Sequence, residues 1–195
     1  MRIAAAIVAI VAALSLFAQW QVSSTLMTGA KPAQVAWRML GYFTVLGNLA
    51  ALFIMLSVVY SGKIRARRAA AIVVVMATVG IGYHGLLADL WQPKGLAWWA
   101  DQGLHTAVPL LVIAWWAAFA PKDGLKWYDA VRWLIWPILY TDYALVRGLA
   151  SGFYPYPFLD ISVLGIAQVI LNVAALAGGF MAPGLLIIGI ARASR

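Results

Sequence analysis

The chain consists of long apolar segments separated by short polar connections. A helix that crosses a bilayer needs about 20 mostly apolar residues, because hydrocarbon cannot hydrogen-bond an exposed backbone. Six segments meet this requirement, and the connections between them carry Pro, Gly and charged residues. We therefore predict an all-α fold, a polytopic membrane helix bundle. Its six transmembrane helices are expected at about 3–22, 36–60, 69–91, 103–120, 131–149 and 163–190.

Composition supports one membrane domain. Of the 195 residues, 65% are hydrophobic and 10% are charged, whereas soluble domains carry about 25% charged residues. No segment is polar enough to form a separate soluble domain, and no internal repeat is visible. We expect residues 1–195 to form a single transmembrane domain.

The first apolar segment begins directly after Met1 and Arg2, an arrangement that signal peptides share. No clean small-residue cleavage site follows a short hydrophobic stretch, and the apolar run is long enough to span. We expect a retained transmembrane helix.

The Lys and Arg residues divide unevenly between the two sides of the predicted bundle. Short loops rich in these residues face the cytoplasm, so the richer side is expected inside, together with both termini. The cluster 63–68 is typical of a cytoplasmic loop beside anionic lipid. The inner side holds Arg2, Lys63, Arg65, Arg67, Arg68, Lys122, Lys126, Arg132, Arg192 and Arg195, and the outer side holds Lys31, Arg38, Lys94, Arg147, Asp89, Asp101 and Asp160.

The chain has no cysteine and only two histidines, His84 and His105. Disulfides, thiol nucleophiles and cysteine-ligated metal sites are thereby excluded. Without an HExxH motif, neither a metal centre nor another cofactor is expected. The net charge of +8 is explained by the cytoplasmic loops, so the expected partners are membrane lipids and not nucleic acid. The sequence leaves the oligomeric state open.

Several polar residues fall inside the predicted helices, although an ionisable group near the bilayer centre costs roughly 2.5–3.5 kcal/mol. At a rise of about 1.5 Å per residue, Thr44 is expected roughly 12 Å below the outer end of its helix, and His105 a few ångströms below its own. Four helices place polar groups in the outer half of the bundle, which predicts a polar pocket there. The candidates are His84, His105, Asp142 and Arg147, with Thr44, Asn48 and Asn172 as uncharged companions.

A threonine and a histidine at this level are typical of nucleophilic acyl transfer. The Thr44 hydroxyl becomes a nucleophile once a base takes its proton, and the neutral imidazole of His105 is a natural base. Gly41, Thr44 and Asn48 are spaced by three and four and are expected on one helix face. The pocket or oxyanion candidates are Asn48, His84, Asp142 and Asn172, the carboxylates that can orient an imidazole are Asp101 and Asp142, and the head-group candidates are Arg38, Lys94 and Arg147.

Each of these residues also has a purely structural explanation, which the sequence leaves open. A threonine in a membrane helix often bonds back to the carbonyl four residues earlier or packs against a neighbour. Asn48 and Asn172 are often interhelical hydrogen-bond partners. Asp142 and Arg147 can neutralise each other on one helix.

Three blocks in order carry a resemblance to a known family. They are Tyr42-Phe-Thr-Val-Leu-Gly-Asn48, Leu104-His-Thr-Ala-Val-Pro109 and Tyr156-Pro-Phe-Leu-Asp160. With the matching hydropathy they cover most of the chain. The chain resembles the androgen-induced-gene (FAR-17a-like) family of multi-pass membrane proteins, whose bacterial branch is often labelled Pr6Pr.

The resemblance implies a threonine hydrolase of lipid esters, such as fatty acid esters of hydroxy fatty acids. The essential threonine and histidine of animal members fall in the first two blocks, at Thr44 and His105. The chain lacks the extended loop that animal members carry between their second and third spans. Because bacteria need not contain the animal lipids, the resemblance implies an ester lipid with a long acyl chain as substrate. It also implies a multi-pass protein of the bacterial inner membrane.

Two rival functions use the same polar residues. The first is a non-catalytic lipid-binding or carrier protein. The second is a small transporter or channel built around His84, Asp142 and Arg147, although the chain shows no inverted repeat and no clear pair of broken helices.

Overall fold

The structure is a computed structural model that describes residues 1–194, and every regular element in this range is helical. The chain forms two compact units, Met1–Gly124 and Leu125–Arg195. The first unit contains α1 (Arg2–Leu26), α2 (Pro32–Met39), α3 (Phe43–Ser61), α4 (Ala66–Gly82), η1 (Tyr83–Leu87), η2 (Ala88–Leu90), α5 (Leu96–Gln102), η3 (Gly103–Ala107) and α6 (Val108–Phe119). The second contains α7 (Tyr128–Trp133), α8 (Ile135–Ser151), η4 (Pro157–Leu159) and α9 (Ile161–Ala193).

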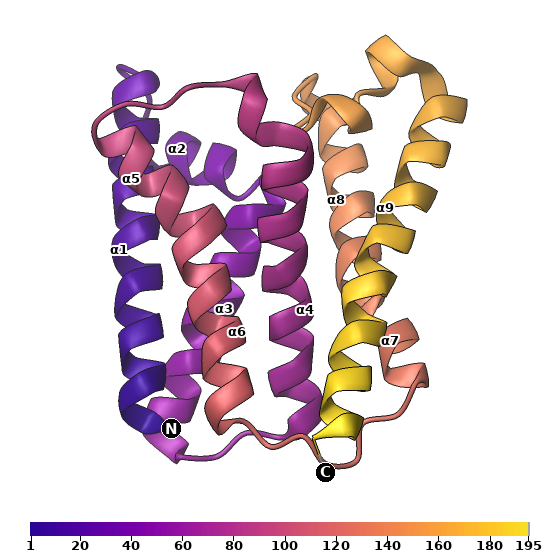
Figure 1. The fold of residues 1–195 in the computed structure, drawn as a ribbon. Helices are drawn as coiled ribbons and strands as arrows, with labels where there is room; N and C mark the ends of the chain where they lie inside the picture. The colour runs from indigo at the N-terminus through magenta and orange to yellow at the C-terminus, as the bar shows by residue number, and fades with distance from the viewer. Residues whose placement is uncertain (195) are drawn as a thin grey trace. The chain divides into compact units, whose positions relative to one another are not determined.

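Five helical segments are long and apolar enough to cross a membrane, and four of them belong to the first unit. These four run alternately up and down the unit (Figure 1). They are Arg2–Leu26, Phe43–Ser61, Ala66–Leu90 and Leu96–Phe119, and the fifth is Ile161–Ala193 in the second unit. The predicted all-α fold is confirmed for the described residues, and the five long apolar helices are compatible with a membrane bundle, whereas the six predicted crossings stay a prediction.

Glycines allow the helices of the first unit to approach closely, as is common between membrane helices. A Cβ added at Gly47 of α3 would lie 2.9 Å from the Met76 side chain of α4. A Cβ added at Gly103 of η3 would overlap the Ser15 side chain of α1. The second of these contacts fixes the height at which η3 packs against α1.

The predicted helix 36–60 is divided in the structure. It breaks at residues 40–42, where the N–H groups of Gly41 and Tyr42 bond to carbonyls three residues earlier and Tyr42 becomes extended. Glycine disfavours a helix interior, which explains the position of the break. Gly41 therefore does not share a helix face with Thr44, and Thr44 is the second residue of α3 rather than lying roughly 12 Å inside a helix.

The predicted helix 103–120 begins earlier than expected, at Leu96. Asp101 and Gln102 lower the hydropathy of this segment, so sequence reasoning placed Asp101 in an outer loop. In the structure Asp101 is buried inside a continuous helical run. His105 consequently lies nine residues after the first helical residue, which is deeper than the few ångströms that the sequence predicted.

The second unit contains the other two predicted segments. The segment 131–149 is split at Leu134 between α7 and α8. The 17 residues of α8 span about 26 Å at 1.5 Å per residue, slightly less than a bilayer core of about 30 Å. Its crossing stays a prediction. In α9, Gly165 has a φ of 73° and introduces a kink.

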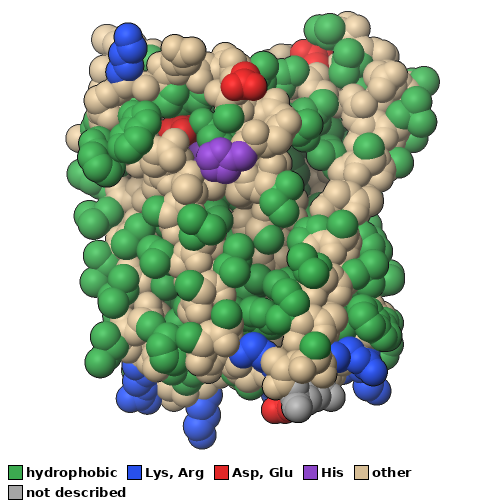
Figure 2. All heavy atoms as spheres, viewed as in Figure 1, with side chains coloured by type: hydrophobic (Ala, Val, Ile, Leu, Met, Phe, Trp, Pro, Cys, Tyr) green, Lys and Arg blue, Asp and Glu red, His purple; other side chains and the backbone are tan. Residues whose placement is uncertain are grey.

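Charge is distributed asymmetrically along the first unit. Lys and Arg side chains gather mostly at the end where the chain begins, whereas a histidine side chain reaches the surface toward the opposite end (Figure 2). At the basic end Arg2 bonds to the carbonyl of Tyr60. The Lys122 ammonium bonds to the carbonyls of Trp116 and Ala117 in the last turn of α6 and of Ala120 directly after it. A cation at a helix C-terminus is stabilising.

Candidate functional site

An aspartate–histidine pair lies at the centre of the candidate site. The Nδ1 atom of His105 lies 3.2 Å from Oδ1 of Asp101 and 3.0 Å from the Asp101 backbone carbonyl, one helical turn earlier. Both neighbours are acceptors, so Nδ1 carries the proton and Nε2 keeps its lone pair. The Asp101 side chain is 1% exposed and that of His105 is 16% exposed. The pair therefore presents an imidazole whose orientation is fixed at Nδ1.

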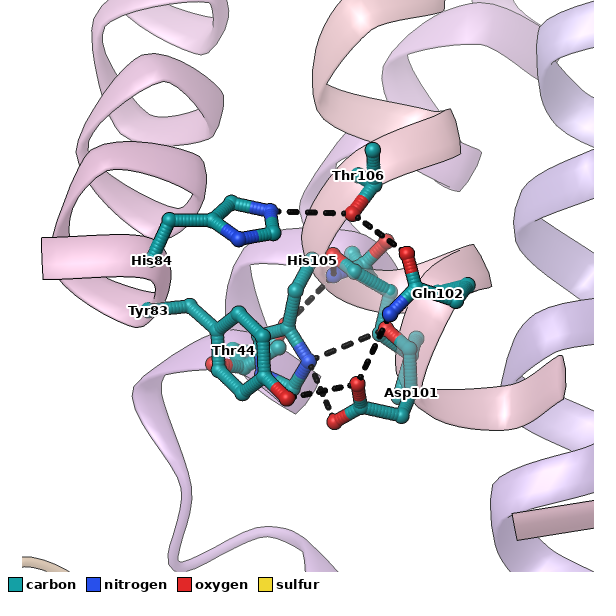
Figure 3. Close-up of polar contacts among 9 residues, drawn as sticks. Thr44, Tyr83, His84, Asp101, Gln102, His105 and Thr106 are labelled. Carbon is teal, nitrogen blue, oxygen red and sulfur yellow. Dashed lines mark hydrogen bonds and ion pairs between the residues drawn. The ribbon is translucent and has the colours of Figure 1, made fainter. Parts of the chain in front are cut away.

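Tyr83 of η1 holds both members of this pair. Its hydroxyl donates to Oδ2 of Asp101 at 2.6 Å, and its ring stacks on the His105 imidazole with centroids 3.9 Å apart and planes 14° from parallel (Figure 3). The hydrogen bond stabilises the buried carboxylate, and the stacking fixes the plane of the imidazole. Sequence reasoning did not identify Tyr83, although it precedes the intramembrane His84.

Both histidines lie in π-helical turns, η1 and η3. In η3 the Val108 N–H bonds five residues back to Gly103. The next donor in that register would be residue 109, but Pro109 has no N–H, so the Leu104 carbonyl lacks its partner within the helix. Such single π-helical turns are frequent at functional sites, and this one directs His105 toward Tyr83.

Asn48 links the helix that carries Thr44 to the turn that carries His105. Its Nδ2 donates to the Thr44 carbonyl at 2.9 Å and to the Leu104 carbonyl at 3.1 Å. The two carbonyl oxygens are therefore at most about 6 Å apart. Both N–H groups of this fully buried amide are used, so its geometry supports a positioning role and not the oxyanion role that the sequence allowed.

Thr44 lies in the first turn of α3 and is buried. Its hydroxyl makes no hydrogen bond with any of residues 1–194, so the back-bond that often occupies a membrane threonine is not formed there. The first bond within this helix is donated by Leu46 to Tyr42. The N–H groups of Thr44 and Val45 precede it and have no carbonyl partner inside the helix.

A polar arm leads from Asp101 to the surface. Gln102 Nε2 donates to Asp101 Oδ2 at 3.3 Å, and Gln102 Oε1 accepts from the Thr106 hydroxyl at 3.1 Å. Thr106 Oγ1 lies 3.0 Å from Nε2 of His84, which is exposed (Figure 3). His84, predicted as a pocket residue, thus belongs to the same hydrogen-bonded group as His105. Sequence reasoning did not identify Gln102, which preceded the predicted helix 103–120, or Thr106, which lay within it.

Two candidates of the second unit, Arg147 and Asp142, lie in different environments. Arg147 is buried, donates to the Tyr143 hydroxyl at 3.0 Å and packs over the Phe153 ring. Asp142 is exposed and forms no ion pair with Arg147 in the described part of the chain, so the expected neutralisation within one helix is not observed.

Of two further candidates, Asn172 has a structural role and Arg38 lies at the surface. Asn172 donates to the Phe158 carbonyl at 2.9 Å and accepts from Gln168, and it thereby fixes the turn before α9. Arg38 is exposed at the end of α2, the end of the first unit opposite the N-terminus. Among the residues described, no cluster of three or more His, Asp or Glu side chains is arranged to hold a metal ion.

Comparisons with family models, with curated proteins and with solved structures gave no match.

Proposed function

We propose that the protein is a membrane hydrolase of lipid esters in which Thr44 is the nucleophile and His105 the base. The observation that carries the proposal is the Asp101–His105 pair: the Asp101 backbone carbonyl accepts from Nδ1, the buried carboxylate lies 3.2 Å from the same nitrogen, and Nε2 is left to take a proton. A nucleophile, a base and a group that orients the base form the usual arrangement for covalent acyl transfer.

The reaction has two steps. In the first, the Thr44 oxygen attacks the ester carbonyl while its proton passes to His105 Nε2, and the imidazolium then gives that proton to the departing alcohol. In the second, His105 takes a proton from water, which attacks the acyl-threonine and releases the fatty acid. The Asp101 carboxylate stabilises the imidazolium that forms in both steps.

The start of α3 supplies a place for the developing negative charge. The N–H groups of Thr44 and Val45 have no carbonyl partner inside the helix, and the positive end of the helix dipole lies there. Fixed N–H donors aimed at an oxyanion are typically a large contribution to acyl transfer. This role replaces the one that sequence reasoning gave to the Asn48 side chain.

The surroundings favour a lipid substrate. The helices of the first unit expose large apolar side chains such as Ile10, Phe53, Ile81 and Leu110, which fit acyl chains as neighbours. The basic end of the unit is proposed to face the cytoplasm, so that the site lies toward the outer leaflet. With α8 as the sixth crossing, both termini are cytoplasmic. The sequence resemblance supports the same substrate class and a bacterial inner membrane.

A fluorophosphonate probe tests this proposal. The Thr44 oxygen would bond to phosphorus with loss of fluoride, giving a stable adduct. We expect labelling of the purified protein in detergent, loss of labelling in Thr44→Ala and His105→Gln, and retention in Thr25→Ala. Thr25 is the matched control because it lies on α1 and only bonds back within its own helix. Absence of labelling in well-folded protein would contradict the hydrolase and favour the lipid carrier.

A further inference from the structure

The polar arm between the two histidines has a direction. A threonine hydroxyl has one proton, and that of Thr106 is donated to Gln102 Oε1. Thr106 Oγ1 can therefore only accept from His84, so Nε2 of His84 must carry its proton. The neutral His84 ring then has its lone pair on Nδ1.

The direction originates at the Asp101 carboxylate. Ionised carboxylate oxygens only accept hydrogen bonds, so Gln102 must turn its NH₂ group toward Asp101 and its carbonyl toward Thr106. This orientation in turn draws the Thr106 proton away from His84. The carboxylate thus determines the protonated nitrogen of a ring that it does not touch.

We propose that His84 and His105 are coupled through Asp101 and held in opposite tautomers, with His84 as a positioning residue at the exposed end of the network. His105 is protonated on Nδ1 because that nitrogen faces the acceptors of Asp101. His84 is protonated on Nε2 because that nitrogen faces the Thr106 oxygen, whose own proton is donated to Gln102. Loss of Thr106 or of Gln102 releases His84, and loss of Gln102 also removes one donor from Asp101.

The effect of this coupling on catalysis rests on the proposed hydrolysis, in which Asp101 orients the base. The coupling of the two tautomers does not depend on that proposal. Two donors, from Tyr83 and Gln102, bond to Oδ2 of Asp101, and His105 Nδ1 lies 3.2 Å from Oδ1 while bonding to the Asp101 backbone carbonyl. Hydrogen bonds in such a chain polarise one another, so loss of the arm weakens the fixation of the carboxylate and slows acylation without removing the base.

Nitrogen-15 NMR of histidine-labelled protein tests the coupling directly. The spectrum contains only two imidazoles, and His105→Gln leaves the His84 signals alone for assignment. With both rings neutral, we expect wild-type His84 to be protonated on Nε2 and His105 on Nδ1. A wild-type His84 protonated on Nδ1 would overturn the proposal.

The decisive variant is Gln102→Leu, since Gln102 bonds to neither histidine ring. Its loss leaves the Thr106 hydroxyl free to donate to His84, and the His84 signals should change to a mixture of tautomers. Gln19→Leu is the matched control, because Gln19 is also half-buried and bonded to a hydroxyl, that of Ser23. Unchanged His84 signals in Gln102→Leu would contradict the coupling.

A second pair of variants covers the case in which Gln102→Leu does not fold. Thr106→Ser keeps the hydroxyl and should keep both tautomers, whereas Thr106→Val should release His84. Equal His84 spectra for the two variants would contradict the proposal.

Probe labelling separates this inference from the proposed function. Coupled tautomers in a protein whose Thr44 is never labelled would sustain the network and refute the hydrolase. Labelled Thr44 in a protein whose histidines are not coupled would support the hydrolase and refute the network. If both hold, Gln102→Leu should label more slowly than Gln19→Leu at equal probe concentration.

Discussion

The Asn48 side-chain amide donates a hydrogen bond to the backbone carbonyl of Leu104, 56 residues later in the chain. Leu104 immediately precedes His105, and the same amide also binds the Thr44 carbonyl. One buried side chain therefore sets the position of the proposed nucleophile relative to the proposed base. The need for this bond comes from Pro109, which cannot donate to Leu104.

Replacing Asn48 by Leu should destabilise the protein by about 2–4 kcal/mol, because buried carbonyls lose their donors. It should also abolish probe labelling of Thr44. Thermal unfolding in detergent and labelling at saturating probe measure the two effects. Asn172→Leu serves as the control, since it removes a comparable amide–carbonyl bond in the second unit and should lower stability while labelling persists. Full labelling of Asn48→Leu would show that the two hydrogen bonds of the Asn48 amide are not needed for reaction of Thr44.

Pro109→Ala should reduce the cost of losing Asn48. Alanine restores the N–H that proline lacks, so the turn regains a donor for its carbonyls. In a double-mutant cycle of Pro109→Ala and Asn48→Leu, we expect a coupling of about 1 kcal/mol or more, as for residues that share one hydrogen-bond network. Additive losses of stability would contradict the link between the proline and the π-helical turn.

Gly103→Ala should destabilise the protein by about 1–3 kcal/mol, the usual cost of overpacking. The added methyl group would overlap the Ser15 side chain. The double variant Ser15→Gly, Gly103→Ala should be more stable than Gly103→Ala alone. Gly178→Ala is the control, because a Cβ there meets nothing within 4 Å, and it should be neutral or slightly stabilising. Unfolding temperatures measured under identical detergent conditions provide the comparison.

Membrane orientation can be tested by single cysteines, since the natural chain has none. A cysteine in place of exposed Lys63 should react with a membrane-impermeant maleimide only after the membrane is opened. A cysteine in place of exposed Lys94 should react in intact cells. Asp123→Cys precedes α7 and Pro157→Cys follows α8, so the two positions report whether this segment crosses the membrane. Equal reactivity of these last two in intact cells would show that α8 does not span.

Hydropathy was sufficient to predict the membrane bundle but not the elements that build the site. Hydropathy does not predict the turn at Gly41, which depends on local backbone geometry. It also does not predict the helix start at Leu96, which depends on polar residues that find hydrogen-bond partners. Asp101 is the clearest case. Its charge suggested a loop, yet Tyr83 and His105 satisfy it inside a helix.

Thr44, His105 and His84 were identifiable because a hydroxyl or an imidazole within an apolar segment is chemically conspicuous. An interhelical hydrogen bond was one of the explanations that the sequence offered for Asn48, but its acceptor was not identifiable because Leu104 lies on a distant turn. The i, i+4 spacing of Asp101 and His105 does predict a contact, but only once both are known to share a helix. Tyr83 and Gln102 carried no signal of their own.

The central claim is that the Thr44 oxygen forms the covalent acyl-enzyme. The most direct test is to treat the purified protein with an activated long-chain ester, quench it in acid and locate the acyl group by peptide mass spectrometry. We expect acylation on Thr44 in the wild type and none in His105→Gln. An acyl group on any other residue, or unmodified Thr44 in folded protein that hydrolyses the ester, would contradict it.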